Sequence, residues 1–300
     1  MSVMSIFFNP GPAIEYANAW FLNKVGMRSG FFQSSLGPLH YLDAQGQGLF
    51  PPIVLLHGVT GSANNFSRMT YQLLRLCRRV IIPDLPGHGQ SPALNPPGDY
   101  QAVILALSEL ISGIVDEPCV IFGNSVGGAA AICTTVTHPE SVCGLFLESP
   151  AGGAITTAER ENLRLCFNGL TMADATQAVK KLFSEPPWWI RINMHVVMRA
   201  LQAPIVDHIL KTIPLEGFSD QALEKISVPT LVVWGTKEMV LPRASLEFYR
   251  KNMPKHVKFL EPVGAGHAPY LENPLRSLKW LREFLQENFQ PALKLVGTGK

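Results

Sequence analysis

The sequence predicts an α/β protein, with a mostly parallel, doubly wound sheet and a helical segment inserted late in the chain. Short apolar runs typical of buried strands alternate with segments whose apolar residues recur every three or four positions, as in amphipathic helices. Residues 151–228 break this alternation, because they show helical patterns and no clear strand. Alternating strands and helices form a parallel sheet covered on both faces. We therefore expect residues 1–150 and 229–300 to form one core and residues 151–228 to form a helical cap.

The expected strands are short apolar runs bounded by turn residues. They cover residues 39–43, 53–56, 80–83, 119–122, 144–147, 230–234 and 257–260. The expected helices cover residues 65–77, 99–115, 126–136 and 274–289, with Asp99 as the N-cap of the second. In such sheets ligands bind beyond the carboxyl ends of the strands, so the loops at that edge are the first place to look for a functional site.

Composition narrows the class of protein. With 300 residues, 47% of them apolar, the chain is long enough for a sizeable core. Its 25 basic and 23 acidic residues nearly balance, and there is no basic tract, so we expect no nucleic-acid partner. The five cysteines stand singly at apolar positions, which predicts reduced thiols, no metal site and a cytoplasmic location. Neither a signal peptide nor an apolar run of transmembrane length is expected.

Residues 13–25 are predicted to form a helix at the beginning of the chain. Its apolar residues stand near helical spacing, and it also carries Tyr16 and Trp20. Such a helix can lie on a membrane surface. A helix of this kind more often packs on its own domain, so membrane contact is a possibility that the sequence does not favour.

The pentapeptide Gly-Asn-Ser-Val-Gly at residues 123–127 is the strongest functional signal. It falls between a predicted strand and a predicted helix, which is how one large hydrolase fold exposes a nucleophilic serine, here Ser125. Gly123 and Gly127 suit a turn in which the strand and the helix nearly touch. The pentapeptide by itself also fits a glycine turn whose serine only caps the helix.

A nucleophilic serine needs an imidazole to take its proton and an acid to orient that imidazole. His267 follows the strand at 257–260 and so lies on a loop at the carboxyl edge of the sheet. Glu238 follows another strand at the same edge and is the expected acid, in the chain order nucleophile, acid, base. Glu148 ends a neighbouring strand and is the alternative acid.

Attack on a carbonyl creates an oxyanion, which two backbone N–H groups usually stabilise. The expected donors are Val126, next to the serine, and Val59, in the loop that follows the strand Ile53–Leu56. In the expected cap, four bulky side chains are candidates for an acyl pocket, although core packing is the commoner role for any one of them. They are Trp188, Trp189, Met194 and Met198.

Taken together, these residues resemble the α/β-hydrolase superfamily across nearly the whole chain. The motifs that carry the resemblance are His57-Gly58, Asp84-Leu-Pro-Gly-His-Gly-Gln-Ser91, Gly123 to Gly128, the loop at 235–242 and Gly266-His267. More narrowly, the chain is similar to cap-bearing esterases and monoacylglycerol-lipase-like members, including Ser149-Pro150-Ala151-Gly152 before the cap. It departs from the usual pattern at Glu238, where aspartate is common.

The residues and the resemblance imply a cofactor-free serine hydrolase. Ser125 would attack an ester carbonyl, His267 would act as base and then acid, and Glu238 would orient it. The apolar cap favours a small-molecule ester with a hydrophobic acyl chain. Two alternatives remain open: Asn124 is similar to the residue before the nucleophile in carbon–carbon bond hydrolases of ring-cleavage pathways, and the fold can also serve as a non-catalytic receptor. The oligomeric state cannot be predicted from the sequence.

Overall fold

We describe residues 10–93, 97–167 and 171–289 from a computed structural model of the chain. In this part of the chain, one sheet has eight strands in the order β1-β2-β4-β3-β5-β6-β7-β8. The first four in the sequence are β1 (Arg28–Ser34), β2 (Gly37–Gln45), β3 (Ile53–Leu56) and β4 (Arg79–Pro83). The others are β5 (Cys119–Asn124), β6 (Val142–Glu148), β7 (Thr230–Val233) and β8 (Lys258–Leu260). β2 pairs antiparallel with β1 and β4, and every other pairing is parallel. The predicted α/β class and mostly parallel sheet are therefore confirmed.

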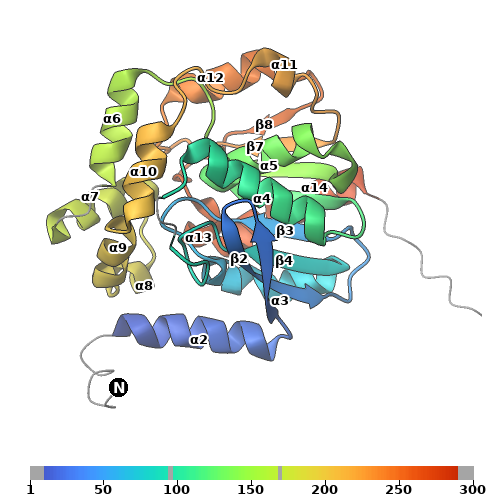
Figure 1. The fold of residues 1–300 in the computed structure, drawn as a ribbon, viewed down its shortest axis with the longest axis horizontal. Helices are drawn as coiled ribbons and strands as arrows, with labels where there is room; N and C mark the ends of the chain where they lie inside the picture. The colour runs from blue at the N-terminus through green and yellow to red at the C-terminus, as the bar shows by residue number, and fades with distance from the viewer. Residues whose placement is uncertain (1–9, 94–96, 168–170, 290–300) are drawn as a thin grey trace, which may run out of the picture.

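Helices cover both faces of this sheet (Figure 1). On one face lie α4 (Tyr100–Ile114), α5 (Val126–Thr137) and α12 (Arg243–Asn252), whose buried side chains form one hydrophobic cluster with the sheet. On the other face lie α3 (Ser67–Leu76), α13 (Pro269–Glu272) and α14 (Pro274–Asn288), which form a second cluster. The short 3-10 helices η1 (Ala63–Phe66) and η2 (Pro139–Ser141) lead into α3 and β6. Because both faces are covered, β3 and β5 are wholly buried, which explains why they read as unbroken apolar runs.

Between β6 and β7 the chain forms a run of helices. Their bounds are α6 (Thr157–Cys166), α7 (Met172–Leu182), α8 (Trp188–Arg191), α9 (Met194–Leu201), α10 (Pro204–Thr212) and α11 (Asp220–Leu223). Figure 1 shows α6 to α10 gathered at one end of the sheet. Capping boxes begin α6 at Thr156 and α7 at Thr171, where the hydroxyl and the acid three residues later satisfy free N–H groups of the first turn. We call residues 151–228 the inserted segment.

The first described helix, α2 (Pro10–Lys24), packs beside α3. Its Leu22 is buried in the cluster on that face of the sheet, whereas Tyr16 and Trp20 are 67% and 64% exposed. Lys24 lies over the Trp20 ring at 5.6 Å. The helix therefore packs on its own domain, and contact of its exposed aromatic side chains with a membrane stays a prediction. No helix in the described ranges is long and apolar enough to cross a bilayer.

Candidate active site

Ser125 lies in the tight turn that joins β5 to α5. Its backbone has φ 53° and ψ −120°, a conformation that side-chain-bearing residues rarely adopt and that costs about 1–3 kcal/mol. Two glycines make the turn possible. A Cβ on Gly127 would lie 2.5 Å from the Leu56 carbonyl oxygen, and a Cβ on Gly123 would lie 2.6 Å from the Gly127 carbonyl oxygen. The strained turn therefore holds the Ser125 side chain clear of its own helix at the carboxyl edge of the sheet.

His267 contacts Glu238 in the loops that follow β8 and β7. The His267 Nδ1 atom lies 2.7 Å from Glu238 Oε2, and both side chains are 3% exposed. The other carboxylate oxygen, Oε1, accepts hydrogen bonds from the backbone N–H groups of Val240 (2.7 Å) and Leu241 (3.0 Å). Burial alone would raise the pKa of Glu238, but His267 and the N–H of Leu241 outweigh it, so this pKa lies below its ordinary value. An ionised Glu238 fixes the imidazole with Nδ1 as donor and leaves Nε2 free to accept a proton.

Ser125 and His267 line the same small cavity, of about 40 Å³. Gly58, Val59 and Thr60 form another part of its wall. Apolar and aromatic side chains from the inserted segment and from the start of α13 also line it, and these are Phe167, Leu182, Phe183, Tyr270 and Leu271. A space of this size holds about one water molecule, so a larger substrate requires these walls to move.

Both expected oxyanion donors lie beside this cavity or at its edge. Val59 lines it directly, and Val126 is the residue after Ser125 at the first position of α5. Among the described residues, neither backbone N–H has a hydrogen-bond partner. Thr60, directly after Val59, has φ 72°, so the loop bends sharply at this position. Two free donors, one in the loop after β3 and one at the first position of α5, are what stabilisation of an oxyanion requires.

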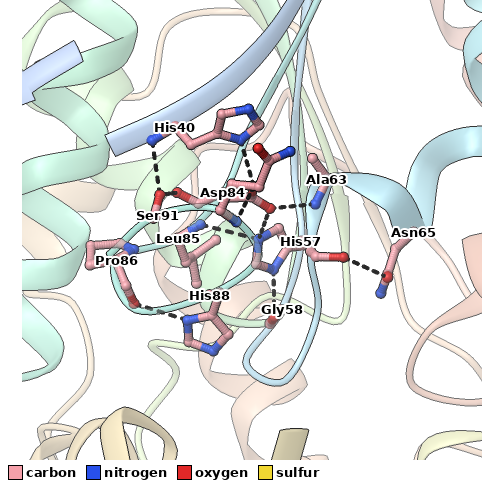
Figure 2. Close-up of polar contacts among 12 residues, drawn as sticks. His40, His57, Gly58, Ala63, Asn65, Asp84, Leu85, Pro86, His88 and Ser91 are labelled. Carbon is pink, nitrogen blue, oxygen red and sulfur yellow. Dashed lines mark hydrogen bonds and ion pairs between the residues drawn. The ribbon is translucent and has the colours of Figure 1, made fainter. Parts of the chain in front are cut away.

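A second polar cluster holds the loop that carries Val59 (Figure 2). Buried Asp84 accepts hydrogen bonds from the backbone N–H groups of Ala63 (2.6 Å) and Gln90 (3.0 Å) and contacts His40 Nδ1 at 2.7 Å. His57 donates from Nδ1 to the Gly58 carbonyl (2.8 Å). These contacts join the loop after β3 to the loop after β4, so the cluster is a structural support for the expected oxyanion site.

Two histidines of this cluster, His57 and His88, are neutral. His57 Nε2 accepts from the N–H of Leu85 (3.1 Å), and burial lowers the pKa of His57. His88 donates from Nδ1 to the Pro86 carbonyl (2.9 Å) and accepts at Nε2 from the N–H of Thr60 (3.3 Å). Burial, with the neighbouring His57, lowers the pKa of His88 to about 4. Each ring thus uses one nitrogen as donor and the other as acceptor, which only the neutral imidazole can do.

Glu148, the alternative acid, does not contact His267 in this structure. Its Oε2 accepts from the backbone N–H of Tyr270 (3.0 Å), and its Oε1 accepts from the Ser277 hydroxyl (2.6 Å). Burial raises the pKa of Glu148 to about 7, although these two hydrogen bonds act in the opposite direction. The strand ends of β6 and β7 are neighbours, as expected, but the Glu148 carboxylate binds α13 and α14 and not the imidazole.

The four side chains expected to form an acyl pocket do not line the cavity that holds Ser125. Trp188 is 68% exposed, and Met194 and Met198 pack on the hydrophobic core. Trp189 stacks under Arg68, with 5.2 Å between the guanidinium carbon and the ring centre, in an adjoining cavity. The sequence pattern could not distinguish residues that line the cavity from residues of the hydrophobic core, because both kinds are apolar and recur at helical spacing. Tyr270 and Leu271 also line the cavity, and their position shortly after His267 in the chain could have indicated this.

The Alpha/beta hydrolase family model matches residues 53–278 of this chain. Lipase 3 of Moraxella sp. (strain TA144) is 29% identical over 237 residues, which cover 74% of this chain and 73% of that protein.

Solved structures agree in fold. A crystal structure of a membrane phospholipase A, described as a novel bacterial virulence factor, has a TM-score of 0.78 at 23% identity and covers 93% of this chain and 92% of its own. The structure of 2-hydroxy-6-oxo-6-phenylhexa-2,4-dienoate hydrolase from Rhodococcus sp. strain RHA1 has a TM-score of 0.74 at 21% identity, with 87% and 99% covered. At these identities both show a shared fold alone. Since the family model spans most of the chain, including the serine turn and His267, this protein belongs to the alpha/beta hydrolase family.

Proposed function

We propose that this protein is a serine hydrolase that cleaves carboxylic esters through an acyl-enzyme. The observation that carries the proposal is the arrangement around one cavity: Ser125 and His267 line it, and Glu238 contacts the far nitrogen of the imidazole at 2.7 Å. The lipase named above adds support, since it is 29% identical over most of its length.

In the proposed reaction, Ser125 Oγ bonds to the ester carbonyl carbon while its proton passes to His267 Nε2. The N–H groups of Val59 and Val126 would stabilise the oxyanion of the tetrahedral intermediate. Collapse of that intermediate breaks the bond to the alcohol oxygen, which leaves with the proton from His267. Water then gives a proton to His267 and attacks the acyl carbon, and the acid is released as Ser125 regains its proton. Glu238 orients the imidazole and stabilises its charged form.

The proposed substrate is an uncharged ester with an apolar acyl part. Four apolar side chains that line the cavity support this, namely Phe167, Leu182, Phe183 and Leu271. We propose that the inserted segment acts as a cap, and that its side chains shift to admit the acyl chain, since about 40 Å³ is far below the few hundred Å³ of ordinary ligand pockets. We also propose a reducing compartment such as the cytoplasm, supported by five free cysteines.

Two other functions are less well supported. Carbon–carbon bond hydrolysis rested on Asn124, but the Asn124 amide nitrogen donates to the carbonyls of Glu148 (3.0 Å) and His267 (2.9 Å) and so holds the site together instead of facing a substrate. A receptor without chemistry would not need the strained turn and the buried acid that orients His267.

A panel of p-nitrophenyl esters with acyl chains of rising length tests the proposal. The wild-type protein should hydrolyse at least one of them, and Ser125→Ala should lose about 10³-fold or more of kcat. A fluorophosphonate probe should label Ser125 and no residue in the Ser125→Ala variant. Full activity in that variant, or a wild-type protein that neither reacts with the probe nor cleaves any ester, would refute the function.

A further inference from the structure

Glu148 is a fully buried acid that the proposed reaction does not use. It ends β6, at the edge where the site lies, and its side chain is 0% exposed. Among the described residues no lysine or arginine forms an ion pair with it, and its partners are the neutral N–H of Tyr270 and the hydroxyl of Ser277. Burying an acid without a cation is costly. An apolar residue would avoid this cost, but it could not accept the hydrogen bonds from Tyr270 and Ser277.

The side chain of Glu148 holds the segment that follows the catalytic histidine. Tyr270 lies three residues after His267, at the start of α13, and Ser277 lies in α14. One carboxyl group thus binds the N–H of a short helix and the hydroxyl of the next helix, at 3.0 and 2.6 Å. These two contacts fix where α13 begins and therefore where the loop with His267 ends.

The backbone of Glu148 holds the turn that carries the nucleophile. Its carbonyl oxygen accepts from the N–H of Ser125 (3.2 Å) and from the amide of Asn124 (3.0 Å). The same Asn124 nitrogen donates to the His267 carbonyl at 2.9 Å. Glu148 is therefore linked to the nucleophile by its main chain and to the histidine segment by its side chain.

We propose that Glu148 is a positioning residue that sets the location of His267 relative to Ser125 and so controls the chemical step. The proposal rests on the proposed serine hydrolase function. Glu148 acts through the backbone of Tyr270 and through Ser277, without touching substrate or imidazole.

The test compares Glu148→Leu with Glu148→Gln. Leucine is similar in size but accepts no hydrogen bond, so the Tyr270 N–H loses its partner. We expect kcat for p-nitrophenyl butyrate to fall about 10-fold or more, with KM changed by less than about 3-fold. Glutamine keeps an acceptor for Tyr270 and a donor for the Ser277 oxygen, so kcat should return to within about 3-fold of wild type. Ser277→Ala removes one contact only and should fall between the two.

The melting temperature distinguishes a positioning role of Glu148 from a general loss of stability. Leucine removes a buried acid but leaves the Tyr270 N–H and the Ser277 hydroxyl without their acceptor, which typically costs about 1–3 kcal/mol. Glu148→Leu should therefore melt only a few degrees below wild type and stay folded under assay conditions, while it turns over more slowly. Should Glu148→Leu fail to fold, Ser277→Ala carries the test, with a lowered kcat and an unchanged KM expected.

A spectroscopic measurement tests the positioning role of Glu148 independently of ester hydrolysis. The proton between His267 Nδ1 and Glu238 should give a low-field ¹H NMR signal, which should shift or broaden in Glu148→Leu and remain in Glu148→Gln. Equal kcat in Glu148→Leu and wild type, with an unchanged signal, would overturn the proposal. So would a Glu148→Gln variant as impaired as Glu148→Leu, because the charge itself would then be needed. A wild-type protein that cleaves no ester refutes the function, whereas the signal still reports on positioning.

Discussion

Two histidines of this protein each contact a buried carboxylate at 2.7 Å, and they lie in regions for which we propose different roles. His267 contacts Glu238 beside the cavity that holds Ser125. His40, in β2, contacts Asp84 in the loop after β4 (Figure 2). The second pair also has a serine, since Ser29 Oγ lies 2.8 Å from His40 Nε2. On hydrogen bonds alone, Ser29, His40 and Asp84 look like a catalytic triad.

The surroundings of the two serines differ. Ser29 is an exposed residue of β1, at the edge of the sheet, where it pairs with Leu42. Ser125 lies in a strained turn at φ 53°, between glycines that leave no room for a Cβ, and next to the free N–H of Val126. If the proposed function is correct, a serine, a histidine and an acid joined by hydrogen bonds do not suffice for catalysis. The strained turn, the two expected oxyanion donors and the cavity distinguish the Ser125 site from the Ser29 row.

The largest expected difference between the pairs is the effect of removing each histidine. His267→Gln should lower kcat for ester hydrolysis by about 10⁴-fold or more, because no base remains for Ser125. His40→Gln should leave kcat within about 3-fold and instead lower the free energy of unfolding by about 1–3 kcal/mol, through loss of a hydrogen bond to a buried carboxylate. Steady-state kinetics and urea unfolding measure the two effects. A His40→Gln protein as inactive as His267→Gln would show that His40 is also needed for the reaction.

The second largest expected difference between the two pairs is the effect of replacing each acid by its amide. Glu238→Gln keeps the volume but favours the wrong tautomer of His267, and kcat should fall by up to about 10⁴-fold with little loss of stability. Asp84→Asn puts an NH₂ group among the donors of Ala63, Gln90 and His40, so the free energy of unfolding should fall by about 3–5 kcal/mol. Steady-state kinetics and urea unfolding again measure the two effects. If Glu238→Gln retains wild-type kcat, Glu238 is not the acid of the site.

A third expected difference is in the dependence of stability on pH near the Asp84 cluster. The folded pKa of His88 is about 4, below the value of about 6.5 for an unfolded histidine, so the unfolded chain binds more protons between these pH values. This contribution to stability is complete above about pH 6.5 and is lost as the pH falls toward 4, by about 3 kcal/mol in total. His88→Gln should show a shallower decrease of melting temperature over this range. An unchanged slope would contradict the assignment of His88 as a buried neutral ring.

The smallest expected effect is that of Ser29→Ala. The Ser29–His40 hydrogen bond is partly buried and contributes about 1 kcal/mol, so the melting temperature should fall by a few degrees at most and kcat should not change. Peptide mapping after fluorophosphonate treatment should find the label on Ser125 and none on Ser29. Label on Ser29 would show that its histidine activates it and that the edge strand carries a second nucleophile.

Several elements were predictable because local chemistry decides them. The buried strands β3 and β5 were expected from apolar runs, and Asp99 caps α4 as expected, accepting from the N–H of Ala102. Other elements were missed, among them β1, α12 and the short α13. β1 carries a glycine and mostly half-exposed or exposed residues, so it has no clear alternation, and α12 begins after a proline without an N-cap hydrogen bond from a side chain.

By itself, the sequence determined the α/β class, the strained turn at Ser125 and the placement of Glu238 and His267 on loops at one edge of the sheet. These follow from periodicity, from glycines that only a close approach requires, and from the rule that parallel strands end at the same edge. Only the tertiary structure decided that Glu238 reaches the imidazole while Glu148 is held by α13 and α14, and which apolar residues of the inserted segment face the cavity. The physical reason is that strand order brings both acids to one edge. Which of them binds His267 depends on contacts with α13, whose Tyr270 lies 122 residues after Glu148 in the chain.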